Sequence, residues 1–122
     1  MGKSNLILLF ILVSFSKLNA QEKAFYWITF KDKSTTSFST NNPSEFLSEK
    51  AIARRAKQNI EITEQDLPVS QNYINSVLSF PDIELHNSSK WLNAVLIKTD
   101  NKSSIDAIQN LSFVKANDSI QP

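Results

Sequence analysis

One short segment near the start of the chain constrains the fold more than any other, because it has apolar side chains on both faces of a strand. Residues 24–30 read AFYWITF. Successive side chains of a β-strand point to opposite faces of the sheet. One face carries Tyr26, Ile28 and Phe30, and the other carries Phe25 and Trp27. A half-buried strand would alternate apolar with polar residues, so this segment predicts a sheet with apolar surface on both sides.

The first 20 residues have the pattern of a secretory signal peptide and are set apart from the fold. Lys3 supplies a positive charge, the apolar run LILLFILVSF follows at 6–15, and Ala20 precedes the expected cleavage point. A transmembrane helix is the alternative, but this run is shorter than the roughly 20 residues that cross a bilayer. We therefore expect export of the chain to the periplasm or the extracellular space.

The composition argues against several classes of function. The chain has 13 basic residues, of which Lys3 and Lys17 lie in the first 20, and 12 acidic residues, so the exported part has a net charge of −1. This charge gives no electrostatic basis for binding nucleic acid or anionic membranes. Gly2 is the single glycine and there is no cysteine, which argues against a glycine-rich phosphate loop and a disulfide framework.

Hydrophobic periodicity and capping residues predict two helices after the first strand. Asn42, Pro43 and Glu45 are start signals of a helix that we expect to run to about Gln58. Its apolar stripe would comprise Phe46, Ile52, Ala53, Ala56 and Ile60. Ser70 can cap the second helix. The later predicted elements are a strand at 83–87, a strand at 91–98, a helix after DNKSS at 100–104 and a short strand at 113–116.

This order of elements predicts an α+β fold of the ferredoxin-like (split βαβ) type. In that fold a four-stranded antiparallel sheet has helices on one face. The second face would then be open, and an exposed apolar patch of this kind marks a binding surface. The alternative is that a loop, or the connector at 59–69, covers that face.

No catalytic or metal-binding group stands out in the sequence. His86 is the only histidine, and a Ser/His/Asp site would need it as the base, but no nucleophile motif accompanies it. We therefore interpret His86 as an exposed or edge residue. The acidic residues of the connector, including Asp66, are interpreted as solvated charges, and Arg54 and Arg55 as complements to a helix dipole. We expect neither a metal nor another cofactor.

Four stretches of the chain carry a resemblance when they are read in order. They are YWITFKDK, NPSEFLSEKAIARRAKQNI, ITEQDLPVSQNYINSV and SSKWLNAVLIK. As a set they resemble the N-terminal leader of bacterial subtilisin-like serine peptidases over about residues 24–116. The resemblance implies a signal peptide at 1–20, a propeptide (inhibitor-like) domain with a ferredoxin-like fold at 21–116, and the start of a tail that binds the substrate cleft at 117–122.

The resemblance also implies a role and a set of contact residues. Propeptides of this family act as intramolecular chaperones and inhibitors of their own protease, and their open sheet face packs on helices of the protease domain. The implied contact residues are Phe25, Trp27 and Thr29 in the first strand, Trp91, Asn93 and Val95 in the third strand, and Ile120 and Pro122 in the tail. The expected partner is the cognate subtilisin-like protease domain, without nucleic acid or membrane.

The chain departs from the family pattern after its last predicted strand. No DTG-like, HGT-like or GTSMA-like stretch is present before Pro122. We therefore expect that this chain is not itself an enzyme and that it is a fragment of a longer serine endopeptidase precursor, or a truncated product. The alternative is a free-standing exported protease inhibitor or protein-binding module with the same fold. The coding sequence after Pro122 would distinguish the two.

Overall fold

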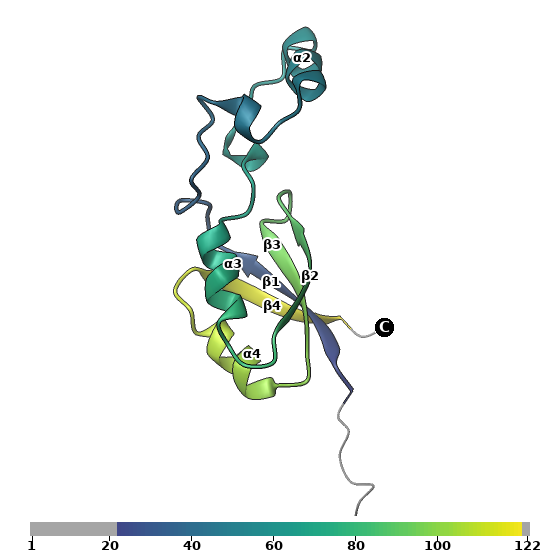
Figure 1. Cartoon of the computed structure of the whole chain (residues 1–122), viewed down its shortest axis with the longest axis vertical. Helices are drawn as coiled ribbons and strands as arrows, with labels where there is room; N and C mark the ends of the chain where they lie inside the picture. The colour runs from purple at the N-terminus through teal and green to yellow at the C-terminus, as the bar shows by residue number, and fades with distance from the viewer. Residues whose placement is uncertain (1–21, 121–122) are drawn as a thin grey trace, which may run out of the picture.

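A four-stranded antiparallel sheet forms the centre of the structure, a computed structural model that describes residues 22–120 (Figure 1). The strands are β1 (Ala24–Phe30), β2 (Glu84–Ser89), β3 (Ala94–Thr99) and β4 (Val114–Ile120). Their order across the sheet is β2-β3-β1-β4. Helices connect β1 to β2 and β3 to β4. This topology is ferredoxin-like and confirms the predicted fold class.

Three α-helices accompany the sheet in the described residues: α2 (Glu49–Lys57), α3 (Gln71–Leu78) and α4 (Lys102–Gln109). Short 3-10 turns lie at η2 (Pro43–Glu45) and η3 (Glu64–Asp66). Figure 1 shows α3 and α4 on one face of the sheet, whereas α2 lies apart, at the far end of an extended segment. We call this segment, residues 31–66, the arm, and the sheet with α3 and α4 the body.

The hydrophobic core lies between one face of the sheet and the helices α3 and α4. Ile28 and Val95 are adjacent partners on β1 and β3, and both side chains are fully buried. The core residues are Ile28, Phe30, Val69, Tyr73, Ile74, Val77, Val95, Ile97, Ile105, Ile108 and Val114. Full burial of an aliphatic side chain of this size contributes roughly 1.5–3 kcal/mol. The body is therefore stabilised by apolar burial and not by disulfides, since the sequence has no cysteine.

The caps of the body helices follow the sequence signals. The Ser70 side chain accepts a hydrogen bond from the Tyr73 amide at the start of α3, as predicted, and Asn101 accepts one from the Ser104 amide at the start of α4. Each contact satisfies a backbone donor that the first helical turn leaves free.

The first helix begins later than the capping signals predicted. Asn42 and Pro43 start only the 3-10 turn η2, and Asn42 makes no side-chain cap. The α-helix begins at Glu49, where the Ser48 side chain accepts a hydrogen bond from the Ala51 amide at 3.1 Å. Ser48 itself has an extended backbone, which separates the two helical segments. None of the α2 residues is buried, so the predicted apolar stripe does not form part of the core.

Two strand boundaries also differ from the predictions. β3 begins at Ala94 rather than at residue 91, because Asn93 adopts a left-handed backbone with φ of 49° and ends the β2–β3 turn. β4 extends to Ile120 and pairs with β1 along that length. Residues 117–120 therefore belong to the sheet rather than to a separate tail. The predicted signal peptide at 1–20 and the end of the tail at 121–122 lie outside the described residues.

Candidate functional site

The face of the sheet opposite α3 and α4 is the first candidate binding surface. Figure 1 shows no described helix or loop across it, so neither a loop nor the 59–69 connector provides the predicted alternative cover. Directly paired residues of antiparallel strands share a face. The register pairs Phe25 with Lys98 and Ile120, Trp27 with Leu96, and Thr29 with Ala94. We call the surface formed by Phe25, Trp27, Thr29, Leu96, Lys98 and Ile120 the open face.

The apolar side chains of the open face are only partly covered by their neighbours. Phe25, Trp27 and Leu96 are half-buried, and Ile120 is 39% exposed. The His86 ring meets Phe25 edge-on with a centroid distance of 5.0 Å, and Lys98 Nζ lies 5.2 Å from the Phe25 ring centroid. Such aromatic and cation–π contacts add modest stability at exposed sites. His86 is thus an exposed residue of the edge strand β2, as interpreted from the sequence.

One predicted contact residue faces the core instead of the solvent. Val95 is 0% exposed and packs in the core opposite Ile28, so the expectation that it faces outward is wrong. The prediction counted alternate residues from position 91, but the turn at 90–93 does not follow the alternation of a strand. The outward residues of β3 are Leu96 and Lys98, which the sequence analysis missed and which the pairing with Trp27 and Phe25 identifies.

The other predicted contact residues are spread over three places. Phe25, Trp27 and Thr29 lie together on the open face, in the predicted orientation. Trp91 and Asn93 lie in the β2–β3 turn, outside the open face. Ile120 lies in β4 beside Phe25, and Pro122 lies outside the described residues.

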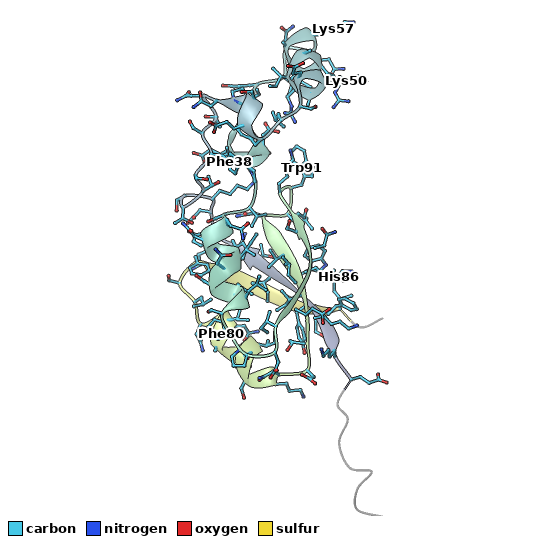
Figure 2. All side chains as sticks on the ribbon, viewed as in Figure 1. Phe38, Lys50, Lys57, Phe80, His86 and Trp91 are labelled. Atoms are coloured by element: carbon cyan, nitrogen blue, oxygen red, sulfur yellow. The ribbon has the colours of Figure 1, made fainter. Side chains whose placement is uncertain are left out.

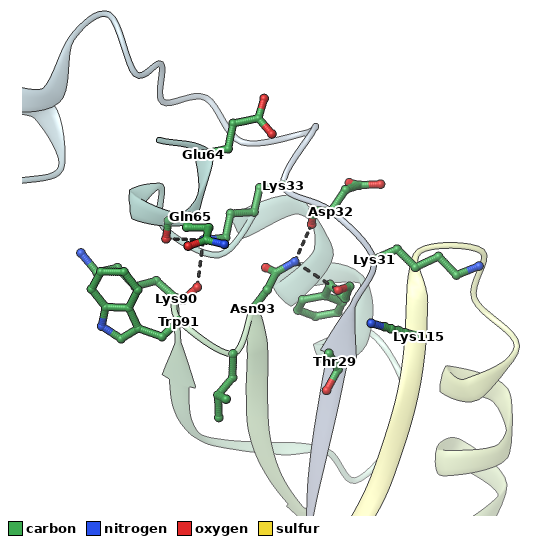
Figure 3. A pocket seen from close by; sticks show the side chains of 12 residues that line it. Thr29, Lys31, Asp32, Lys33, Glu64, Gln65, Lys90, Trp91, Asn93 and Lys115 are labelled. Atoms are coloured by element: carbon green, nitrogen blue, oxygen red, sulfur yellow. Dashed lines mark hydrogen bonds between the residues drawn. The ribbon is translucent and has the colours of Figure 1, made fainter. Parts of the chain in front are cut away.

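A second candidate surface is a hollow of ≈ 360 Å³ at the end of the sheet where β1 leaves and β3 begins (Figure 3). Its walls come from the last residues of β1, from η3 and from the β2–β3 turn. Four lysines line it, Lys31, Lys33, Lys90 and Lys115, together with two acidic residues, Asp32 and Glu64. The hollow therefore has an excess of positive charge.

The side chain of Lys33 forms hydrogen bonds with the segments that make up the walls of this hollow. Its Nζ donates hydrogen bonds to the carbonyls of Gln65 at 3.0 Å and Lys90 at 2.9 Å (Figure 3), and to the carbonyl of Leu67 at 2.6 Å. These three acceptors match the three donors of an ammonium group. Burial lowers the pKa of Lys33 below its ordinary value, and the nearby charge of Lys90 lowers it further. Lys33 therefore connects three segments through hydrogen bonds: the end of β1, the η3 connector and the β2–β3 turn.

A buried acid stabilises the arm internally. Asp66 is 2% exposed, and its Oδ1 lies 2.8 Å from Nη2 of Arg55 in α2. Its Oδ2 accepts a hydrogen bond from the Thr63 amide at 3.0 Å. Asp66 therefore contacts nearby backbone and is buried, so its interpretation as a solvated charge is wrong. An ion pair compensates the burial of the carboxylate, since an uncompensated buried charge is costly.

Two kinds of site are absent from the described residues. Within residues 22–120, no group of three or more His, Cys, Asp or Glu side chains is arranged to hold a metal ion. In the same part of the chain, none of the helices has the length and apolar character needed to cross a membrane. The two surfaces described above are suited to binding another macromolecule, because both are open and combine apolar with charged groups.

The match to a known family covers both surfaces. A family model described as the peptidase S8 propeptide domain of Bacteroidota matches residues 25–121. No curated protein matches the chain, and no solved structure does. The matched segment runs from β1 through β4 and includes the arm.

Proposed function

The chain belongs to the peptidase S8 propeptide domain family of Bacteroidota, and from this premise we propose that it acts as a chaperone and inhibitor of a subtilisin-like peptidase domain. The family is that of the propeptide, which is not itself the catalytic part of a precursor. The family name implies that the precursor is a subtilisin-like peptidase. We further propose that the precursor is exported, on the basis of the first 20 residues.

The observation that carries the proposal is the apolar open face. Trp27 and Leu96 are paired across β1 and β3 on the side that no described helix covers. Both are half-buried within the isolated chain, so a partner layer could remove more of their surface from water. Aromatic residues of this kind supply much of the binding energy of protein interfaces. The exposed apolar surface of this pair supports a docking role for the open face.

Docking on this face would account for both roles. A domain that binds the folded peptidase but not its unfolded chain stabilises the folded state by mass action. If the contact already forms in the folding transition state, folding is also accelerated. Covalent linkage in the precursor gives the domain a high effective concentration, which falls when the linkage is cut.

The substitution Trp27→Ser tests the open face. We expect it to weaken binding to the purified peptidase domain of the same precursor by about 2 kcal/mol, or roughly thirtyfold in Kd. The free energy of unfolding of the chain itself should change less. Inhibition titrations and urea unfolding measure the two quantities.

Tyr26→Ser provides the matched comparison, because Tyr26 is the neighbouring aromatic residue and packs against the core. It should lower stability more than Trp27→Ser does. If Trp27→Ser reduces stability and binding equally, Trp27 acts as a core residue and the proposed docking face is wrong.

A further inference from the structure

The β2–β3 turn presents two large apolar side chains to solvent at its tip. Trp91 is 63% exposed and Leu92 is 59% exposed, the two highest values among the large hydrophobic residues of the described chain. The Trp91 ring is covered only in part, by Lys90 Nζ at 4.8 Å from its centroid. Figure 2 shows Trp91 at the end of the hairpin, beyond the packed body. Neither side chain therefore contributes to the core.

Hydrogen bonds with Phe30, Asp32 and Lys33 fix the backbone beneath these side chains. Asn93 Nδ2 donates to the carbonyls of Phe30 at 3.1 Å and Asp32 at 2.9 Å (Figure 3). The Asn93 carbonyl accepts from the Phe30 amide at 2.8 Å, and the Lys90 carbonyl accepts from Lys33. The turn thus holds Trp91 and Leu92 in place at both of its ends. A pre-positioned apolar group loses less conformational entropy on binding than a mobile one.

The surroundings of the turn are positively charged. Lys31, Lys90 and Lys115 line the adjacent hollow together with Lys33, whose amine is already occupied by carbonyls. Of the two acidic residues there, Asp32 accepts hydrogen bonds from the Tyr73 hydroxyl and from Ser34. Its carboxylate keeps its negative charge, so Asp32 and Glu64 offset part, but not all, of the positive charge of the lysines. Exposed apolar groups beside several amines match a partner surface that combines an apolar pocket with carboxylates.

We infer that the turn surface, formed by Trp91, Leu92, Lys31, Lys90 and Lys115, is a second docking site for an acidic, apolar segment of the peptidase domain. This inference rests on the proposed function, because it assigns a further contact to the same partner. The two surfaces adjoin, because Thr29 of the open face also lines the hollow beside the turn. One partner can therefore contact both surfaces, and the turn extends the docking area beyond the sheet.

The two components of the turn surface have separate effects that can be measured. The double variant Trp91→Ser/Leu92→Ser should raise Kd for the purified peptidase domain on the order of tenfold to thirtyfold at both low and high salt. The charge reversal Lys90→Glu/Lys115→Glu should raise Kd mainly at low salt and reduce its dependence on salt, because screening weakens exposed charges. Isothermal titration calorimetry at two NaCl concentrations gives both results.

Two matched control variants on the body test whether the loss of affinity is specific to the turn surface. Leu85→Ser removes an apolar side chain that is 42% exposed on β2, where its register partner is the core residue Ile97. Lys102→Glu reverses an exposed charge at the start of α4. Neither should change Kd by more than about twofold, in line with the small effect of residues outside an interface core. Circular dichroism and thermal unfolding would verify that all variants fold.

Four outcomes decide the inference. Loss of affinity in the turn variants but not in the controls supports it. If Trp27→Ser weakens binding while both turn variants bind as the unmodified chain does, the inference is overturned and the proposed function stands. If the unmodified chain does not bind the peptidase domain, both are overturned. If sedimentation shows that the turn instead mediates self-association, and peptidase binding is unchanged in the variants, the occupant is a second copy and the inference is wrong.

Discussion

The body and the arm contain similar sequence signals, yet different forces hold them in place. In the body, α3 and α4 bury apolar side chains against the sheet, with Val77 and Ile108 fully buried. In the arm, α2 has a serine cap and an amphipathic sequence but no buried residue. Hydrogen bonds from Lys33 to the carbonyls of Leu67 and Lys90 attach the arm to the rest of the chain, and the Arg55–Asp66 ion pair holds α2 against η3 within the arm. Capping and periodicity thus indicate that a helix forms, but not what it packs against.

Truncation of a buried side chain should give the largest difference in unfolding free energy between the body and the arm. Ile28→Ala removes a fully buried side chain and leaves a cavity, so we expect the free energy of unfolding to fall by about 2–5 kcal/mol. Ile52→Ala in α2 changes a half-buried residue and should cost less than about 1 kcal/mol. Urea unfolding followed by tryptophan fluorescence measures both. Equal costs would mean that the arm packs as tightly as the body.

Removing the arm's ion pair should have the next largest effect. Arg55→Ala leaves the buried Asp66 carboxylate uncompensated. We expect this to lower the free energy of local unfolding of the arm by about 1–3 kcal/mol. The loss should be local, so hydrogen exchange should accelerate in the arm and remain slow in the strands. The double variant Arg55→Ala/Asp66→Asn should regain part of the protection. Equal acceleration throughout the body would contradict the separation of the two regions.

The two serine caps allow the same substitution to be made in each region. Ser70→Ala removes the cap of α3 within the body, where Ser70 is 0% exposed, and should lower global stability by about 0.5–2 kcal/mol. Ser48→Ala removes the exposed cap of α2 and should fray that helix without shifting the main unfolding midpoint. Thermal unfolding and hydrogen exchange distinguish these results. A similar midpoint shift in both variants would show that the regions unfold as one unit.

The smallest expected effect concerns the acid sensitivity of the junction between arm and body. Hydrogen bonds from the Tyr73 hydroxyl at 2.6 Å and then from Ser34 lower the pKa of Asp32 below its ordinary value of 3.8. A carboxyl group with a lowered folded-state pKa contributes stability above pH 3.8 and loses it as the pH falls through the lower folded value.

Asp32→Asn tests this contribution. The variant should be less stable than the unmodified chain at neutral pH, and the difference should shrink as the solution is acidified below about pH 4. Chemical denaturation at a series of pH values measures it. A difference that stays constant with pH would show that ionisation of Asp32 plays no part.

Most of the body could be predicted from the sequence, because its strands and helices bury regular patterns. The alternation in β1 gave the correct faces for Ile28 and Trp27, and Ser70 marked the start of α3. The orientation of Val95 could not be predicted in the same way. It depends on where β3 begins, and a left-handed residue at the turn decides that boundary.

The arm was harder to predict because its decisive contacts are long-range and polar. Asp66 is an acidic residue in a connector, and nothing in its local sequence distinguishes a solvated carboxylate from one paired with Arg55. Similarly, the three carbonyls that surround Lys33 come from segments more than 30 residues away. The open face could be predicted from β1, whereas the hollow at the end of the sheet required the three-dimensional arrangement.

The left-handed turn at Asn93 has a consequence for which side chains the position tolerates. Glycine would adopt its φ of 49° with less strain, but it has no side-chain amide to bridge the carbonyls of Phe30 and Asp32. Most other residues would keep a side chain and lose the backbone conformation. Asn93 therefore meets two requirements at once, a left-handed backbone and a side-chain amide, which different residue types usually meet. Position 93 should therefore accept very few replacements during divergence.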